Sequence, residues 1–390
     1  MNEMVRAHDG ARAPVAISRF VRESAMQLDP LMPAIETQIP AYFYAFQPAH
    51  FASRSGIHLL AEYMGSSAQF FDVRMKHVMT SHWTPAAMRR RFGVWYSGST
   101  WHSTRPLFDE WMFARSIRKR EDSVAHFIYG EFAIPMFPAM FHRRGARVVA
   151  TYHASASRLD EVLGNVRCFE RADGITLMSS SQVPFFLDRG YPEERLRVIL
   201  HGVDTDHFRP LTSRTENDER PLDCLLIGNM GRDHAFVAEV LRKLPAGVLQ
   251  LNVATAQRFR GSYCDTPHLT MLDRLTDEEL LQRYQCADLL LMPMQNCAAN
   301  NVFLESMACG TPIMTNRVGG TPDYVPEECS ILMDRKNVDE WVDRLVDLAK
   351  NRSLLRTWRS EARKRAEELA WPTVATRFQE FYREIIDQGR

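Results

Sequence analysis

The sequence lacks the features that mark several classes of protein. None of its seven cysteines forms a Cys-x-x-Cys pair, and their odd number and scatter suit reduced thiols better than a zinc site or a disulfide framework. No stretch reaches the roughly 18 apolar residues that a membrane-spanning helix needs, and no apolar core of a signal peptide follows the N-terminus. We therefore expect a cytoplasmic protein, with at most peripheral contact with the inner face of a membrane.

The sequence also has no excess of either charge. Lys and Arg total 48, as do Asp and Glu, so no overall field recruits nucleic acid or an anionic membrane. Arg89, Arg90 and Arg91 form a local basic run, for which a solvated helix face is favoured over a lipid-surface contact. Gly-x-Ser-x-Gly, Walker and Gly-x-Gly-x-x-Gly motifs are also missing.

What is present is a pattern of short apolar segments that alternate with helical ones over 390 residues, a length that suggests two or three domains. Such alternation predicts parallel sheets with helices on both faces. The predicted strands are 41–46, 124–129, 147–152, 174–178, 196–200, 224–227, 248–253, 289–292 and 312–315, and the clearest helices are 57–64, 108–118 and 277–285.

The polar, non-periodic stretch 210–221 is the best linker in the chain. It divides the sequence into two Rossmann-like α/β domains, residues 1–209 and 222–370. Residues 1–38 form an extension of the first domain whose structure the pattern does not define, because Asp-Pro and Met-Pro pairs interrupt it.

The segment from Asn300 to Gly320 predicts an anion site. Asn300 or Asn301 is a natural N-cap, and Gly310 is a natural C′ residue. A helix that begins at the carboxyl end of a parallel strand presents N–H groups suited to a diphosphate. Glu305, one turn further in, can accept hydrogen bonds from a ribose diol. A structural helix with a surface Glu fits these residues equally well. In the ligand-site interpretation, Glu305 faces the cleft and is expected to carry no core packing.

This segment resembles the signature of the retaining, GT-B-fold glycosyltransferases of family 4, which reads Glu, seven residues, Glu, then Ala-Met-Ala-Cys-Gly-Xaa-Pro-Val. The resemblance extends from about Ala41 to the C-terminus. It implies two domains that face each other across a cleft, with a last helix at 371–390 that crosses back to the first domain. Further segments that carry it are Thr151-Tyr-His153, Leu196 to Pro210, Leu225 to Arg232 and Trp371 to Tyr382.

The resemblance implies catalytic roles for Arg232, His153 and Glu305. Arg232 would bind the diphosphate and stabilise the charge on the departing phosphate, a task that suits a guanidinium. Glu305 would bind the ribose, and His153 would lie near the donor sugar, although a lone histidine beside a strand is otherwise more often structural. The other implied donor-binding positions are Gly56, Gly231, Arg274 beside the base, Asn300, Asn301 and Val302.

Three positions depart from the family pattern. Cys297 stands where the family has its first Glu, which touches the donor sugar. Val237 stands where it usually has a Lys, five residues after the phosphate-loop Arg, and His201 stands where it usually has Asn. With Arg232 and the Asn-capped helix in place, these departures indicate a divergent branch of the family.

A metal-dependent alternative rests on Asp204-Thr-Asp206, which has the Asp-x-Asp form that holds a divalent cation in the other large glycosyltransferase fold. Because it lies inside a segment that matches family 4, we favour a site without metal and expect no cofactor. His77 and His82 are interpreted as structural.

The function that the resemblance implies is transfer of a hexosyl group from a UDP-, GDP- or other nucleoside-diphosphate sugar to a glycan, lipid-linked or small-molecule acceptor, with retention. The departing phosphate oxygen would take the acceptor's proton, so the carboxylate pair of a glycosidase is not required. The alternatives are a catalytically silent nucleotide- or glycan-binding partner subunit and a sugar-nucleotide epimerase on the same fold.

Overall fold

A computed structural model describes residues 38–45, 54–72, 107–119, 122–131, 137–163, 168–214 and 217–389. The residues from Ile39 onward belong to one compact unit of the chain. Three sequence predictions fall outside the described residues: residues 1–37 of the extension, the basic run Arg89 to Arg91, and the pair His77 and His82.

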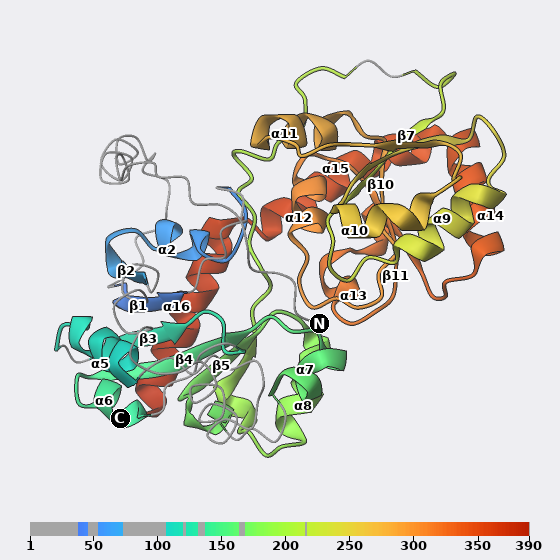
Figure 1. Cartoon of the computed structure of the whole chain (residues 1–390). Helices are drawn as coiled ribbons and strands as arrows, with labels where there is room; N and C mark the ends of the chain where they lie inside the picture. Colours follow the sequence, from blue (N-terminus) through green and yellow to red (C-terminus); the bar gives the residue numbers. More distant parts are fainter. Residues whose placement is uncertain are drawn as a thin grey trace, which may run out of the picture. The chain divides into compact units, whose positions relative to one another are not determined.

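The N-terminal sheet contains six parallel strands (Figure 1). They are β1 (Ala41–Ala45), β2 (Ala68–Asp72), β3 (Ser123–Phe127), β4 (Ala146–Tyr152), β5 (Gly174–Leu177) and β6 (Leu196–Val198). Their order in the sheet is β2-β1-β3-β4-β5-β6.

The C-terminal sheet also contains six parallel strands. They are β7 (Leu222–Ile227), β8 (Leu249–Ala254), β9 (Leu269–Met271), β10 (Leu289–Leu291), β11 (Ile313–Asn316) and β12 (Ser330–Met333). Their order is β12-β11-β10-β7-β8-β9, so β7 and β10 lie at the centre and the chain runs outward on both sides.

All nine predicted strands are confirmed, and three strands were missed. The missed strands β2, β9 and β12 are each an edge strand. β2 reads Ala-Gln-Phe-Phe-Asp, and β9 has only three residues. An edge strand is paired on one side only, so its sequence carries a weaker apolar signal than that of a central strand such as β4, where Val148 and Val149 are both fully buried.

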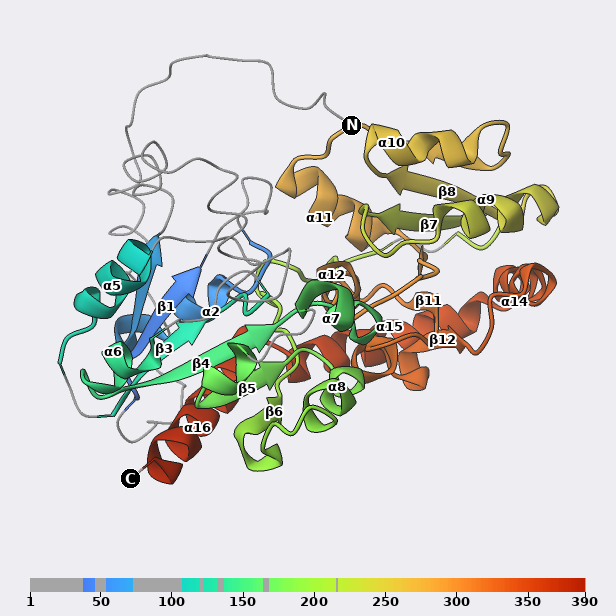
Figure 2. The same cartoon turned by 60° about the horizontal axis from the view of Figure 1, so that its bottom comes forward.

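Helices cover both faces of the N-terminal sheet (Figure 2). On one face, Phe113, Phe141 and Phe186 pack with aromatic side chains of the strands. On the other face, α16 packs against α2 and the strands. The helices of the first face are α5 (Leu107–Ser116), α6 (Pro138–His142), α7 (Ala156–Leu163) and α8 (Val183–Leu187), and those of the second are α2 (Leu59–Tyr63) and α16 (Trp371–Gln388).

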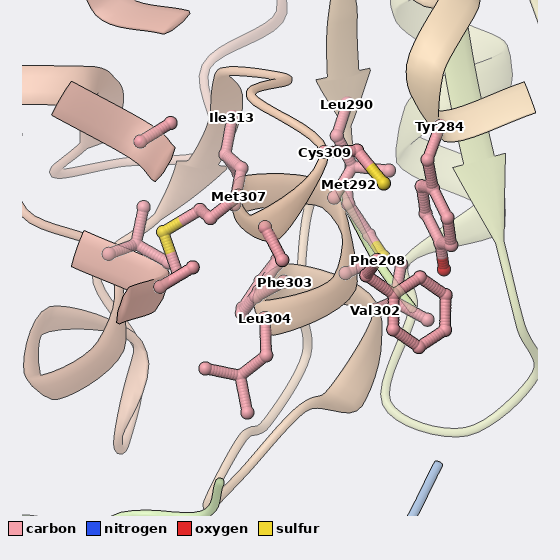
Figure 3. Close-up of a cluster of buried hydrophobic side chains, with 14 of the residues drawn as sticks. Phe208, Tyr284, Leu290, Met292, Val302, Phe303, Leu304, Met307, Cys309 and Ile313 are labelled. Atoms are coloured by element: carbon pink, nitrogen blue, oxygen red, sulfur yellow. The ribbon is translucent and has the colours of Figure 1, made fainter. Parts of the chain in front are cut away.

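The C-terminal sheet is covered in the same way. One face packs on α9 (His234–Lys243) and α14 (Val338–Lys350). The other packs on α11 (Asp277–Cys286), α12 (Asn301–Ala308) and α15 (Arg352–Glu368). Figure 3 shows the side chains of α12 at the centre of this second cluster, with Phe303 and Met307 fully buried. The core therefore fixes α12 tightly against β10 and β11.

The last helix returns to the N-terminal sheet. His126 of β3 is hydrogen-bonded through Nδ1 to the Tyr382 hydroxyl of α16 at 2.6 Å, and both residues are buried. A Cβ at Gly174 would lie 2.8 Å from Ile385, so the absence of a side chain lets α16 approach β5. The connection into the C-terminal domain and the return to α16 pair with each other, because Val203 exchanges backbone hydrogen bonds with Leu369 and Trp371.

The stretch predicted as a linker lies beside the C-terminal sheet. Arg214 and Arg220 both form ion pairs with Asp288, which is buried next to the start of β10. Among the residues that the structure describes, no helix combines the length and the apolar character needed to cross a membrane.

Candidate active site

A cavity of about 600 Å³ is lined by residues of both domains. The N-terminal wall comes from the loop after β3, the loop after β4 and α7, and the C-terminal wall from the loops after β7, β8 and β10. All of these loops follow the carboxyl ends of parallel strands, where ligands of open α/β sheets bind. Within the described residues, the charged side chains that line it are Glu131, Arg158, Arg232 and Arg258.

The loop after β7 is shaped by two glycines. Gly228 and Gly231 have φ angles of +103° and +75°, which residues with a Cβ rarely adopt. A Cβ at Gly228 would lie 2.6 Å from Nη2 of Arg232, and one at Gly231 would lie 2.7 Å from the carbonyl oxygen of Asn296. Gly228 therefore allows the Arg232 guanidinium to fold back over the loop, and Gly231 allows the loop to approach the segment after β10.

Arg232 is held by neutral oxygen atoms. Nε donates to the carbonyl of Ile227 at 3.0 Å, Nη1 to the carbonyl of Met230 at 2.6 Å, and Nη2 to the side chain of Asn300 at 3.2 Å. Burial lowers its pKa from the ordinary value, yet an arginine remains charged. Among the described residues, no carboxylate lies within ion-pair distance of it, and the buried Glu305 interacts with it electrostatically at longer range. Its positive charge is therefore oriented without a direct ionic partner in the described part of the chain.

Asn300 joins this arginine to the N-terminus of α12. Its side chain caps the helix by accepting a hydrogen bond from the N–H of Val302 at 3.1 Å, and it lines the cavity. Gly310, with a φ angle of +73°, ends the helix as predicted. The structure brings Asn300 to the cavity wall, but Asn301 and Val302 do not line it.

Glu305 lies deeper than expected. Only 5% of its surface is exposed, its Oε1 accepts from the Ser55 hydroxyl at 2.5 Å, and its Oε2 accepts from the Tyr284 hydroxyl at 2.8 Å. Burial raises its pKa to about 7. The expectation that Glu305 carries no core packing is wrong, because α12 is covered on nearly all sides and its second turn faces Tyr284.

The N-terminal wall contains a buried carboxylate that the sequence did not single out. Glu131 is 3% exposed, and its Oε1 accepts hydrogen bonds from the backbone N–H groups of His153 and Ala154. The His153 ring lies against Tyr129, with 4.6 Å between ring centroids. His153 thus lines the cavity, with an acidic neighbour. The position of Glu131, directly after a predicted strand, was the signal that could have found it.

Two predicted positions lie away from this cavity. Gly56 has a φ angle of +121° and its carbonyl accepts from the N–H of Leu59 just before α2, which suits a tight turn. It does not line the cavity. Arg274 is exposed in the segment between β9 and α11 and does not line it either.

The departures from the family pattern have clear structural positions. Cys297 lines the cavity, and burial raises the pKa of its thiol to about 12, so it is neutral. Val237 is 1% exposed and packs in the core on α9, where it offers no charge. Arg258, in α10 (Gln257–Arg260), instead brings a second cation from the C-terminal domain. It follows β8, the neighbour of β7, so the strand order was needed to place it at this edge.

His201 and Asp204, the first residue of the Asp-x-Asp sequence, are hydrogen-bonded to the local backbone. Asp204 accepts hydrogen bonds from the N–H groups of Asp206 and His207 at 3.2 and 3.0 Å and so stabilises a turn. His201 is hydrogen-bonded through Nδ1 to the carbonyl of Gly202, and burial lowers its pKa to about 3. In the described part of the chain, no three His, Cys, Asp or Glu side chains are grouped as a metal site.

Two six-stranded parallel α/β domains that share a cavity, with a last helix that returns to the first domain, define the GT-B class of fold. Residues 224–351 match a family model described as "Glycosyl transferases group 1", and residues 71–207 match one described as "Glycosyltransferase Family 4". The chain belongs to glycosyltransferase family 4.

Curated relatives are also named as glycosyl- or mannosyltransferases. One is a D-inositol 3-phosphate glycosyltransferase of Saccharomonospora viridis, 26% identical over 50% of this chain and 51% of its own. Another is a GDP-mannose-dependent alpha-(1-6)-phosphatidylinositol monomannoside mannosyltransferase of Mycobacterium tuberculosis, 26% identical over 56% of this chain and 63% of its own. The chain thus spans about half to two thirds of the length of the relatives that it matches.

Solved structures agree on the fold. A glycosyltransferase from Rickettsia africae has a TM-score of 0.61 at 14% identity and covers 89% of this chain and 98% of its own. Anabaena HepE, solved in complex with UDP-glucose, has a TM-score of 0.59 at 12% identity and covers 87% of this chain and 98% of its own.

Proposed function

We propose that this protein transfers a hexosyl group from a nucleoside-diphosphate sugar to a hydroxyl acceptor, with retention of anomeric configuration. The observation that carries the proposal is the guanidinium of Arg232 in the cavity, which has no direct ion-pair partner among the described residues and is oriented by Asn300 at the N-terminus of α12. A diphosphate needs such a fixed cation, since its negative charge grows as the glycosidic bond breaks. Arg258 adds a second positive charge to the same wall.

The donor would lie with its diphosphate on the C-terminal wall. In this placement, the sugar points toward His153 and Glu131 of the N-terminal domain, which line the same cavity. The departing phosphate oxygen takes the proton of the acceptor hydroxyl, so the reaction does not need a carboxylate as the base. The ribose binds Glu305 only if its diol replaces the Ser55 hydroxyl that now donates to that carboxylate.

The donor and acceptor chemistry can be narrowed by analogy. One relative is named for GDP-mannose, and HepE was solved with UDP-glucose, so both donors belong in the first screen. Both curated relatives are named for inositol-containing acceptors. An inositol phosphate or a lipid-linked polyol is therefore a reasonable first acceptor, beside glycans.

Thermal stabilisation by a panel of nucleotides tests the proposal. The wild-type protein and Arg232→Ala would be heated with UDP, GDP, UDP-glucose, UDP-N-acetylglucosamine and GDP-mannose, each with EDTA. A ligand at 100 times its Kd adds about 2.7 kcal/mol to the free energy of unfolding. At least one nucleotide should stabilise the wild type clearly more than the variant. Lack of stabilisation by every nucleotide would contradict the proposal.

A silent binding subunit is the second candidate, because Cys297 and Val237 remove two charged groups of the family pattern. The transferase and the silent subunit are distinguished by a hydrolysis assay without acceptor. It measures whether the nucleotide sugar that stabilises the protein releases its free sugar. Slow hydrolysis that is lost in Arg232→Ala supports an enzyme, whereas binding without hydrolysis or transfer supports the silent subunit.

A further inference from the structure

Glu131 and His153 leave three polar atoms unused beside the cavity. Oε2 of Glu131 and both ring nitrogens of His153 are buried and have no hydrogen-bond partner. Oε2 lies 3.9 Å from Nδ1, too far for a direct hydrogen bond. Leaving a buried carboxylate oxygen unpaired is unfavourable, so this arrangement indicates a group that binds there.

The local backbone holds Glu131 in this place. Gly130 passes directly over the ring of Tyr152, where a Cβ would lie 2.7 Å from the ring. The other carboxylate oxygen is fixed by the N–H groups of His153 and Ala154. The ring of Tyr129 lies against the imidazole. Both unused groups are therefore positioned before any ligand arrives.

The gap between Oε2 and Nδ1 has the size for one oxygen atom. A hydroxyl oxygen placed about 2.7 to 2.8 Å from each atom spans a separation of this length. A hydroxyl can donate to the carboxylate while it accepts from an imidazole N–H. A phosphate oxygen cannot do both, because it has no proton to donate and is repelled by the carboxylate.

We propose that Glu131, with Nδ1–H of His153, binds a hydroxyl group of the transferred sugar and contributes to the choice of donor. The inference rests on the proposed function. Glu131 is the only carboxylate among the described residues that line the cavity, and the neutral thiol of Cys297 supplies no comparable acceptor. The arginines of the C-terminal wall attract the diphosphate, so the uncharged part of the donor faces Glu131.

The test compares nucleotides with and without the sugar. Calorimetric titration would give the Kd of UDP and UDP-glucose, or of GDP and GDP-mannose, for the wild type, Glu131→Gln and the control Glu193→Gln, an exposed position in the same domain. Glu131→Gln should raise the Kd of the sugar nucleotide roughly 10- to 150-fold. The Kd of the nucleoside diphosphate should stay within about twofold of the wild-type value. Glu193→Gln should change neither. Glu131→Gln keeps one oxygen acceptor for the two N–H groups, and its melting temperature checks the fold.

Monodeoxy analogues of the same donor identify the hydroxyl. The analogue that lacks the bound hydroxyl should bind the wild type more weakly than the parent donor does. The same analogue and the parent donor should bind Glu131→Gln equally well. Equal losses of nucleotide and sugar-nucleotide affinity in Glu131→Gln, or no loss of either, would overturn the inference while leaving the proposed function intact. A wild type that binds no nucleotide at all would instead refute the proposed function itself.

Discussion

The hydroxyl of Tyr284 donates a hydrogen bond of 2.8 Å to the carboxylate of Glu305, and both side chains are buried. The Ser55 hydroxyl donates to the other oxygen of the same carboxylate at 2.5 Å. Ser55 precedes α2 of the N-terminal domain, whereas Tyr284 and Glu305 belong to α11 and α12. The carboxylate therefore links two helices of the C-terminal domain to a loop of the first.

This arrangement predicts a pH dependence of stability. The pKa of Glu305 is raised to about 7 by burial, so the folded protein binds a proton that the unfolded chain loses near its ordinary value of about 4.3. Stability from this group is complete below that ordinary pKa and is lost as pH rises through 7. The free energy of unfolding of the wild type, relative to Glu305→Gln, should fall between pH 5 and pH 8 by up to about 3 kcal/mol.

Urea denaturation of both proteins at the two pH values measures this difference. The buried histidines His126 and His201 also titrate, but they are present in both proteins and cancel. A difference in the free energy of unfolding that does not change with pH would mean that Glu305 is ionised at both pH values. The hydrogen bonds from Tyr284 and Ser55 would then offset the burial of its charge.

Donor binding should separate the roles of Glu305 and Ser55. If the ribose diol replaces the Ser55 hydroxyl, Glu305→Ala should raise the donor KM about 10- to 150-fold, the worth of a hydrogen bond to a charged group. The effect on kcat should be smaller, because the ribose changes little in the transition state. Ser55→Ala removes only the competing hydroxyl and should leave donor affinity equal or higher.

Initial rates at varied donor concentration give the donor KM and the kcat of both variants. Glu305→Ala is also expected to lower stability, since it deprives the Tyr284 hydroxyl of its acceptor, and each KM is therefore measured on protein whose folded fraction is known. Unchanged donor affinity in folded Glu305→Ala would make Glu305 a purely structural residue.

Metal independence is a separate prediction. The Asp204 carboxylate already accepts hydrogen bonds from backbone N–H groups of its own turn, and its Oδ2 lies 3.7 Å from Nη1 of Arg54. It is therefore poorly suited to bind a cation. Turnover should be the same in EDTA as in Mg²⁺ or Mn²⁺. Activity that disappears in EDTA and returns only with Mn²⁺ would show that a metal ion stabilises the negative charge on the leaving group.

The sequence predicted the central strands and the two ends of α12 because each depends on local signals: apolar runs, an Asn cap and a C′ glycine. The place of Arg232 followed from the resemblance to the family. The burial of Glu305 could not be predicted, because Ser55 lies 250 positions away in the chain. Glu131 was missed for a related reason. Its position after a predicted strand was visible in the sequence. Its contact with the backbone of His153 and Ala154 on the neighbouring strand connection was not, because no spacing in the sequence expresses it. Arg258 needed the strand order, which places β8 beside β7.

The most direct measurement of the central claim is the rate of donor cleavage by Arg232→Ala, with the exposed Arg356→Ala as a control. Removing one group that stabilises transition-state charge typically lowers kcat by about 10² to 10³. We predict a loss of this size for Arg232→Ala, with a much smaller change in the Kd of the donor, and wild-type behaviour for Arg356→Ala. A wild-type kcat in Arg232→Ala would remove this arginine from the mechanism and contradict the account.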